Sequence, residues 1–281
     1  MSNLPPIVSA SELQRMSAAE NLKLIEASGS PTARAAYESG HLRGALFMDL
    51  ETQLSSKEKD PVNGGRHPLP TVSDFVYELG QLGLSPGDHL IVYDRLHGAN
   101  AAARLWWMLT ALGHEKVQVL NGGYQAALDE GFPTAAGIQH ASSQTKYPAP
   151  DWCHPMVNLE EVKAATATPT SAIVDVREPS RYAGIQEPID LIAGHIPSAI
   201  NLPFADNLDA NGLFRSPAAL KAVYQPLFDQ YGSQVIFHCG SGVTACHSLL
   251  AIAVAGLPLP SLYVGSWSEW SRNDLPIERS V

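Results

Sequence analysis

The chain carries a degenerate internal repeat, which constrains its fold more than any other feature. Three segments of the first half, each expected to contain a strand, have counterparts in the second: 22–27 with 171–177, 89–94 with 234–239, and 117–124 with 262–267. In both halves the second of these strands leads into a loop of small residues and an apolar helix, predicted over 101–112 and 243–255. Apolar, β-branched strands that alternate with helices are typical of a parallel sheet covered on both faces. The repeat therefore predicts an α/β fold of two tandem domains, each a mainly parallel sheet flanked by helices.

The domain boundaries are expected where this alternation stops. A stretch rich in Gly, Ser and Pro, from about 137 to 155, shows neither helical nor strand periodicity. We therefore expect a first domain over 1–140, a linker over 141–155 and a second domain over 156–281. With 281 residues, 45% of them hydrophobic, the chain is long enough to bury two separate cores.

The composition argues against several classes of partner. A net charge of −10 is unfavourable for binding nucleic acid or an anionic membrane surface. No apolar run is long enough to span a bilayer, and the first residues lack the basic and apolar regions of a signal peptide, so we expect a cytoplasmic location. The three cysteines, Cys153, Cys239 and Cys246, are too few for a disulfide scaffold and lack the C-x-x-C spacing of a zinc site.

Cys239 is the strongest candidate for a catalytic side chain. It ends an apolar strand and opens the sequence Cys-Gly-Ser-Gly-Val-Thr-Ala, which leads directly into a predicted helix. A loop that enters a helix N-terminus presents unpaired backbone N–H groups and the positive end of the helix dipole. Such a setting favours the thiolate, which is the nucleophilic form of cysteine. Gly240 and Gly242 allow the backbone to turn its amides inward. The pattern predicts a nucleophilic thiolate that carries a transferred group.

This loop resembles the active-site loop of the rhodanese superfamily, and in particular that of the 3-mercaptopyruvate sulfurtransferases, whose signature reads C-G-S-G-V-T-A. The match is unbroken from Cys239 to Ala245. The G-H-I-P sequence from Gly194 to Pro197 and the closing G-S-W-S-E-W sequence also match that family. The resemblance covers nearly the whole chain and implies two tandem rhodanese-like domains, of which the second is catalytic.

The resemblance implies a sulfur transfer in two steps. The Cys239 thiolate takes sulfur from 3-mercaptopyruvate, releases pyruvate and holds a persulfide, which cyanide or a thiol such as that of thioredoxin or glutathione then accepts. The backbone amides of the loop are expected to stabilise the persulfide and to bind the substrate. They belong to Gly240, Ser241, Gly242, Val243, Thr244 and Ala245. Because this chemistry needs only the thiolate and the loop, we expect no metal and no organic cofactor.

The carboxylate of the donor calls for arginine, whose planar guanidinium matches it. Arg181 matches the substrate-binding arginine of the family. Shortly before the G-H-I-P sequence, however, Ile189 stands where the family has a second arginine. Arg66 and Arg104 are candidates to replace the missing guanidinium.

The family also contains a serine, a histidine and an acidic residue that are proposed to form a proton relay like that of serine proteases. Ser241 fills the serine position. His67, in the sequence Arg-His-Pro-Leu-Pro, matches the context of the histidine, and Glu51 falls at the acidic position, where aspartate is usual. We therefore predict Cys239, Ser241, His67 and Glu51 as the catalytic residues.

Two further side chains follow from the repeat and from the loop. Asp94 occupies in the first half the place of Cys239, so the first domain is expected to be catalytically inactive. We expect a solvated loop carboxylate at Asp94; the alternative is that it takes the place of a bound anion among inward-pointing N–H groups. Cys246 lies inside the predicted helix, and we interpret it as a small buried residue rather than as a redox partner.

Three alternative functions can be compared with this loop. A thiosulfate sulfurtransferase typically reads C-R-K-G-V-T-A, with two cations for a dianionic donor, whereas Gly240 and Ser241 are neutral here. A cysteine phosphatase needs an arginine where this chain has Ala245. A non-enzymatic rhodanese-like binding module commonly lacks the cysteine, which this chain keeps together with its full loop. The sequence therefore favours an organic, monoanionic sulfur donor.

Overall fold

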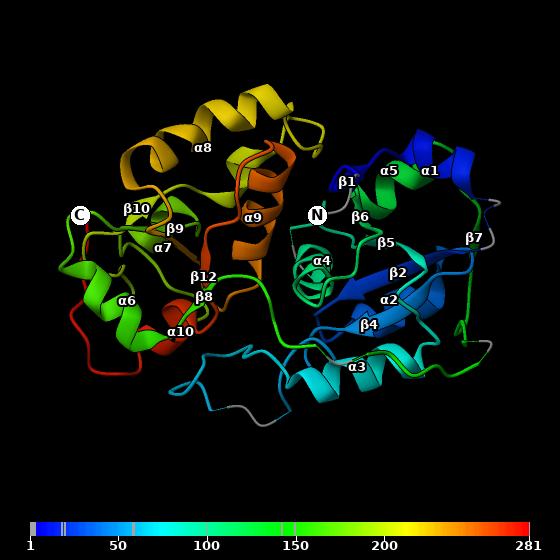
Figure 1. Ribbon diagram of the computed structural model, residues 1–281, viewed down its shortest axis with the longest axis horizontal. Coiled ribbons are helices and arrows are strands. Elements are labelled where there is room, and N and C mark those ends of the chain that lie inside the picture. Colours follow the sequence, from blue (N-terminus) through cyan, green and yellow to red (C-terminus); the bar gives the residue numbers. More distant parts are fainter. Residues whose placement is uncertain are drawn as a thin grey trace. The chain divides into compact units, whose positions relative to one another are not determined.

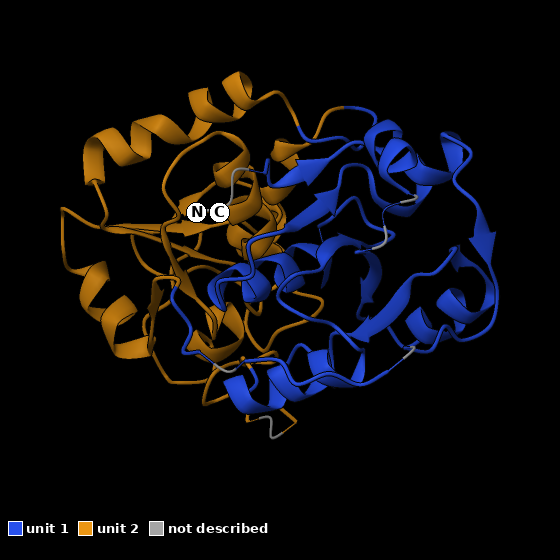
Figure 2. Cartoon of the chain, turned by 45° about the vertical axis from the view of Figure 1, so that its right-hand side comes forward, with its two compact units in different colours: residues 1–55, 70–153, 210–214 blue, residues 56–69, 154–209, 215–281 orange. Residues whose placement is uncertain are grey.

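The computed structural model describes residues 4–17, 19, 21–57, 60–99, 101–141, 143–148 and 150–280. The chain divides into two compact units, shown in blue and orange in Figure 2. Unit 1 comprises residues 1–55, 70–153 and 210–214, and unit 2 comprises residues 56–69, 154–209 and 215–281.

Unit 1 is built on a five-stranded parallel sheet of order β1-β6-β5-β2-β4 (Figure 1). Its strands are β1 (Ile7–Val8), β2 (Leu22–Ser28), β4 (Leu46–Asp49), β5 (His89–Tyr93) and β6 (Val117–Leu120). Its helices are α1 (Ala10–Met16), α2 (Ala33–Ser39), α3 (Val72–Gln81), α4 (Ala101–Ala111) and α5 (Gly123–Asp129). A short antiparallel pair, β3 (His41–Leu42) and β7 (Thr134–Ala135), lies outside this sheet. Residues of α1 and α5 share an apolar core with Leu24 and Ile91 of the sheet, and α4 packs against β2, β5 and β6.

Unit 2 repeats this plan with a sheet of order β10-β9-β11-β12-β8, in which every pair is parallel. Its strands are β8 (Met156–Val157), β9 (Ala172–Asp175), β10 (Ile200–Asn201), β11 (Val235–His238) and β12 (Ser261–Tyr263). Its helices are α6 (Leu159–Thr166), α7 (Pro179–Tyr182), α8 (Pro217–Tyr231), α9 (Thr244–Val254) and α10 (Ser266–Trp270), with a 3-10 turn, η1 (Phe204–Asn207). Ile236 packs into the core formed with α6 and α10, whereas the next residue, Phe237, contacts Tyr224 of α8. Helices therefore cover both faces of the sheet (Figure 1).

The two sheets confirm the predicted repeat. Read in matching direction, β4-β2-β5-β6-β1 of unit 1 corresponds to β10-β9-β11-β12-β8 of unit 2. The first helix of each unit even begins in the same way, with a capping box formed by Ser9 and Glu12 in α1 and by Asn158 and Glu161 in α6. In both units the central strand ends at the critical loop: Asp94 follows β5 and Cys239 follows β11. The carboxyl end of a central parallel strand is where such folds commonly place their ligand sites.

Two segments lie in a different unit from the one that the boundaries 1–140 and 156–281 assign them to. Residues 56–69 belong to unit 2, where the Gly64 N–H donates to Glu269 Oε1 at 2.7 Å. Residues 210–214 belong to unit 1, where the Phe214 N–H donates to Asn121 Oδ1 at 2.9 Å. Much of the expected linker also packs on unit 1, since the Thr145 N–H donates to the Gly80 carbonyl at 3.0 Å. These exchanges depend on hydrogen bonds between distant residues, which periodicity along the chain cannot indicate.

The segments that the structure describes include no helix long and apolar enough to cross a membrane.

Candidate active site

The loop that carries Cys239 is held by the neighbouring helix α10. The Cys239 N–H donates to Ser266 Oγ at 3.2 Å, and the carbonyl of Cys239 accepts the Trp267 N–H at 3.0 Å. Gly242 has a φ of +73°, and a Cβ at this position would lie 2.5 Å from the Val264 carbonyl oxygen. Only glycine fits both requirements. The loop is therefore held by α10 and by the end of β12, and Cys239 is buried, with an exposure of 1%.

The backbone amides around Cys239 form a cradle for negative charge. Within the described part of the chain, five loop N–H groups have no hydrogen-bond acceptor, those of Gly240, Ser241, Val243, Thr244 and Ala245. They lie at the start of α9, an eleven-residue helix whose first turn has no side-chain cap. A helix N-terminus with unpaired amides stabilises an anion placed against it. The geometry thus provides for a thiolate or persulfide at Cys239.

Unit 1 fills the corresponding cradle with its own carboxylate. Asp94 is 1% exposed, and its Oδ1 accepts the N–H groups of Leu96 and Gly98, both at 2.8 Å, while Oδ2 accepts that of Ala102 at 3.3 Å. The expectation of a solvated carboxylate at Asp94 was therefore wrong, and its alternative holds. The physical reason is that amides turned inward at a helix start are better satisfied by a charged acceptor of the chain than by water.

Ser241 and His67 lie together although 174 positions separate them in sequence. His67 Nδ1 and Ser241 Oγ are 2.7 Å apart, and the two residues are 9% and 6% exposed. His67 belongs to the segment 56–69 that folds with unit 2. Glu51 is exposed, in the turn after β4 of unit 1, so its grouping with His67 stays a prediction.

Arg181 takes part in a network of buried ion pairs next to the loop. Its Nη2 lies 2.8 Å from Glu187 and 3.2 Å from Asp190. Burial by itself lowers the pKa of Arg181, but the hydrogen bond and the charge of Glu187, together with Asp190, raise the pKa above its ordinary value. Burial likewise opposes ionisation of Glu187, and its bonds to Arg181 and to backbone N–H groups lower its pKa below the ordinary value. Both groups are therefore charged at neutral pH.

Arg66 approaches the same network from the segment that carries His67. Its Nε lies 2.8 Å from Asp190 Oδ1 and its Nη2 lies 3.4 Å from Oδ2. The Asp190 side chain is fully buried, whereas that of Arg66 is 25% exposed. Asp190 is a site residue that the sequence did not indicate, since a lone acid in a loop carries no periodic signal.

A second buried cluster supports the sheet below the loop. Arg177 pairs with Asp175 at 2.6 Å and stacks on Trp267, with its Cζ 4.6 Å from the ring centroid. His238, the strand partner of Asp175, lies 3.8 Å from that carboxylate. Burial lowers the pKa of His238, although Asp175 opposes the shift, so the imidazole is neutral at neutral pH. This cluster is enclosed in the core and plays a structural part.

The remaining candidates from the sequence are Ile189, Arg104 and Cys246. Ile189 is 54% exposed and offers no charge. Arg104 is fully buried in α4 of unit 1. Cys246 is fully buried in α9, and its Sγ lies 3.3 Å from the Gly242 carbonyl oxygen, in agreement with a small buried helical residue.

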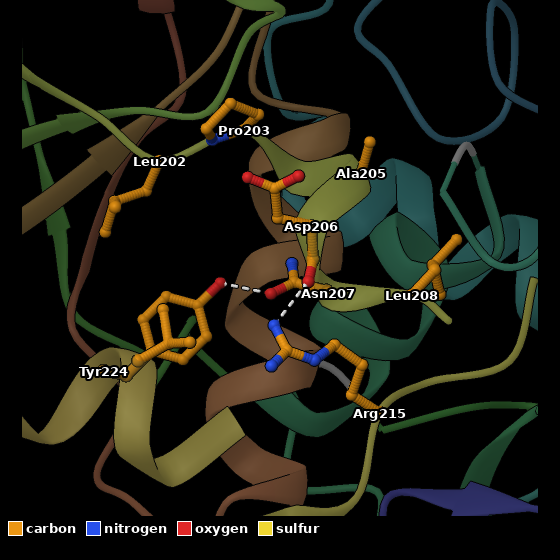
Figure 3. Close-up of a pocket in the computed structure, with 9 residues that line it drawn as sticks. Leu202, Pro203, Ala205, Asp206, Asn207, Leu208, Arg215 and Tyr224 are labelled. Atoms are coloured by element: carbon orange, nitrogen blue, oxygen red, sulfur yellow. Dashed lines mark hydrogen bonds between the residues drawn. The ribbon is translucent and has the colours of Figure 1, made fainter. Parts of the chain in front are cut away.

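Unit 2 also contains a cavity of about 400 Å³. Figure 3 shows the residues that line it. Two hydrogen bonds join residues of its lining: Tyr224 Oη donates to Asn207 Oδ1 at 2.6 Å, and Arg215 Nη1 donates to the Asp206 carbonyl at 3.1 Å. None of its lining residues belongs to the Cys239 loop. In the described ranges, no group of His, Cys, Asp and Glu side chains is arranged to hold a metal ion.

Comparison with known proteins accounts for both units. A family model of the Rhodanese-like domain matches the chain twice, over residues 9–130 and 158–273. The chain belongs to the rhodanese-like domain family. The tandem rhodanese fold predicted from the repeat and from the Cys239 loop is thereby confirmed.

Similar full-length proteins point to sulfur transfer. A probable 3-mercaptopyruvate sulfurtransferase of Pseudomonas aeruginosa is 39% identical over 236 residues, covering 83% of this chain and 82% of the relative. A thiosulfate sulfurtransferase of Mus musculus is 34% identical over 273 residues, covering 92% and 88%. The solved structure of Escherichia coli SseA, described as a 3-mercaptopyruvate sulfotransferase with the rhodanese fold, superimposes with a TM-score of 0.79 at 31% identity, covering 94% of this chain and 99% of that one. The two relatives are thus named as sulfurtransferases and the solved structure as a sulfotransferase.

Proposed function

We propose that this chain is a 3-mercaptopyruvate sulfurtransferase that works through a persulfide on Cys239. The observation that carries the proposal is the cradle beside Cys239 at the start of α9, formed by five loop amides that have no acceptor among the described residues. The cradle supports an anionic sulfur both before and after transfer.

In the first half-reaction the Cys239 thiolate attacks the sulfur of 3-mercaptopyruvate. The new S–S bond forms as the carbon–sulfur bond breaks, and the electron pair of that bond goes to the carbon, which leaves as the enolate of pyruvate and takes up a proton. In the second half-reaction an acceptor thiolate attacks the outer sulfur, the S–S bond breaks, and Cys239 is released as the thiolate. The loop amides hold the charge on sulfur at each stage.

In this proposal Ser241 and His67 handle the proton. The 2.7 Å contact between His67 Nδ1 and Ser241 Oγ joins an imidazole to a hydroxyl that sits two residues after the nucleophile. Imidazole is the side chain most often used as a general acid or base, so a hydroxyl in hydrogen-bond contact with it can exchange a proton. Glu51 is the proposed acidic member of this relay, on the basis of its sequence position alone.

The neutral loop favours 3-mercaptopyruvate over thiosulfate. Thiosulfate is a dianion, and Gly240 and Ser241 offer it no cationic side chain. Thiosulfate stays the second candidate because relatives with that activity are also similar to this chain. For the acceptor we propose a small thiol or thioredoxin. Cys153, Cys239 and Cys246 form no disulfide with one another, which suits the proposed place of action, the cytoplasm.

The test is paired kinetics with 3-mercaptopyruvate and with thiosulfate as donors. Pyruvate release and a mass gain of one sulfur atom on Cys239 are expected with the first donor, and both should vanish in Cys239→Ser. Sulfur transfer that survives in the variant would disprove the persulfide route. A higher kcat/KM with thiosulfate would replace the proposed donor by the second candidate.

A further inference from the structure

The backbone of Arg66 is hydrogen-bonded to helix α10 beside the Cys239 loop. Its backbone N–H donates to Ser268 Oγ at 3.0 Å. The preceding Gly65 has a φ of +78°, and a Cβ there would lie 2.3 Å from the Gly265 carbonyl oxygen, so the segment approaches α10 as closely as a backbone can. The position of Arg66 is therefore built into the fold and does not depend on its side chain.

The guanidinium groups of Arg66 and Arg181 converge on one point beside the nucleophile. Both contact the buried carboxylate of Asp190. A Cβ placed on Gly240, the residue after Cys239, would lie 3.2 Å from Arg66 Nη2 and 3.3 Å from Arg181 Nη2. Asp190 thus positions two planar cations side by side at the residue next to the reacting thiol.

We propose that Arg66 is the second carboxylate-binding residue of the donor site and acts beside Arg181. This inference rests on the proposed function, in which the donor carries a carboxylate close to the sulfur that Cys239 attacks. The Nη1 group of Arg66 has no acceptor among the residues that the structure describes, and its side chain is partly open to solvent. Two guanidinium groups that face one carboxylate bind it by charge-assisted hydrogen bonds. Arg66 supplies the charge that Ile189 lacks.

Two other arginines near the loop do not provide any of the atoms nearest to Gly240. Arg272 reaches Asp190 only at 3.5 Å and donates to the Ser268 carbonyl at 2.8 Å. Arg177 is 1% exposed and is occupied by Asp175 and Glu187. Arg272→Gln is thus a suitable control for Arg66→Gln, because Arg272 also contacts Asp190 but none of its atoms is among those nearest to Gly240.

The experiment compares Arg66→Gln, Arg272→Gln and the double variant Arg66→Gln/Ile189→Arg in the full chain. The readouts are the dissociation constant of pyruvate by calorimetry and single-turnover pyruvate release at increasing 3-mercaptopyruvate concentration. Loss of a charged, bidentate hydrogen-bond donor is expected to weaken both apparent affinities roughly tenfold to a hundredfold while leaving the rate at saturation nearly unchanged. Arg272→Gln should change them less than about threefold. Adding Ile189→Arg to Arg66→Gln should restore most of the affinity.

Each outcome decides the inference. Unchanged pyruvate affinity in Arg66→Gln overturns it, and so does an equal loss in Arg272→Gln, which would trace the effect to Asp190 rather than to Arg66. A wild-type protein that binds pyruvate but takes no sulfur from 3-mercaptopyruvate refutes the proposed function, while the pyruvate series still decides the role of Arg66. A wild-type protein that neither binds pyruvate nor reacts overturns both.

Discussion

Replacing Asp94 by alanine removes the anion that unit 1 supplies to its own amide cradle. The carboxylate accepts three backbone N–H groups, two of them at 2.8 Å and one at 3.3 Å, at a site that is 1% exposed. Hydrogen bonds to charged groups contribute about 1.5–3 kcal/mol each. Counting the two short bonds and taking the lower part of that range, because such contributions are not additive, we expect the alanine variant to lose about 3–5 kcal/mol of the free energy of unfolding of unit 1. Asp94→Asn keeps one carbonyl oxygen for the amides and should lose about 1–2 kcal/mol.

Hydrogen exchange read by mass spectrometry suits this test, because it reports the two units separately where a single melting curve would mix them. The amides of Leu96, Gly98 and Ala102 should exchange faster in Asp94→Ala. Sulfate should slow their exchange more in Asp94→Ala than in the wild type, because the ion can occupy the emptied cradle. A loss below about 1 kcal/mol without any effect of sulfate would refute the account of Asp94 as an internal anion.

Two further predictions concern unit 2. Gly242→Ala should cost about 1–2 kcal/mol of stability for its left-handed backbone and also displace the loop from the Val264 carbonyl, so kcat should fall about a hundredfold or more. The matched control is Gly256→Ala, which should keep kcat, because Gly256 has a φ of +71° but nothing lies within 4 Å of a Cβ placed there. The lowered pKa of His238, which is due to burial against the opposing effect of Asp175, means that only the unfolded chain takes up this proton near its ordinary pKa of 6.5. Stability from this group is therefore complete above pH 6.5 and is lost as the pH falls below it. His238→Gln should flatten the dependence of the free energy of unfolding on pH, measured by urea unfolding between pH 7.5 and 5.5. An equal slope in both proteins would contradict a buried, neutral His238.

The sequence alone predicts those features of the fold and of the site that depend on residues close to one another in the chain. The alternation of strands and helices, the glycine-bounded loop after Cys239 and the helix that follows it are all coded by neighbouring residues. The repeat also identified Asp94 as the residue at the position that corresponds to Cys239. The environment of Asp94 was misjudged, because a carboxylate in a polar loop looks solvated unless the direction of the surrounding amides is known.

What the sequence could not supply depends on contacts between distant segments. The meeting of His67 with Ser241 was foreseen only through resemblance to a family, since nothing in the residues around either one indicates the other. Asp190 gave no signal at all, because its meaning lies in the two arginines it aligns. Arg66 was named as a candidate, but only the fold distinguishes it from Arg104, which is buried in the other unit.

The placement of residues 56–69 in unit 2 has a consequence for how the chain can be divided. A fragment that begins at the expected linker would contain Cys239 and its loop but would lack Arg66 and His67, which are written in the other half of the sequence. The two halves of the sequence are similar, yet the residues grouped around the Cys239 loop come from both of them. We therefore expect a transplanted second half to transfer sulfur only when residues 56–69 are transferred with it.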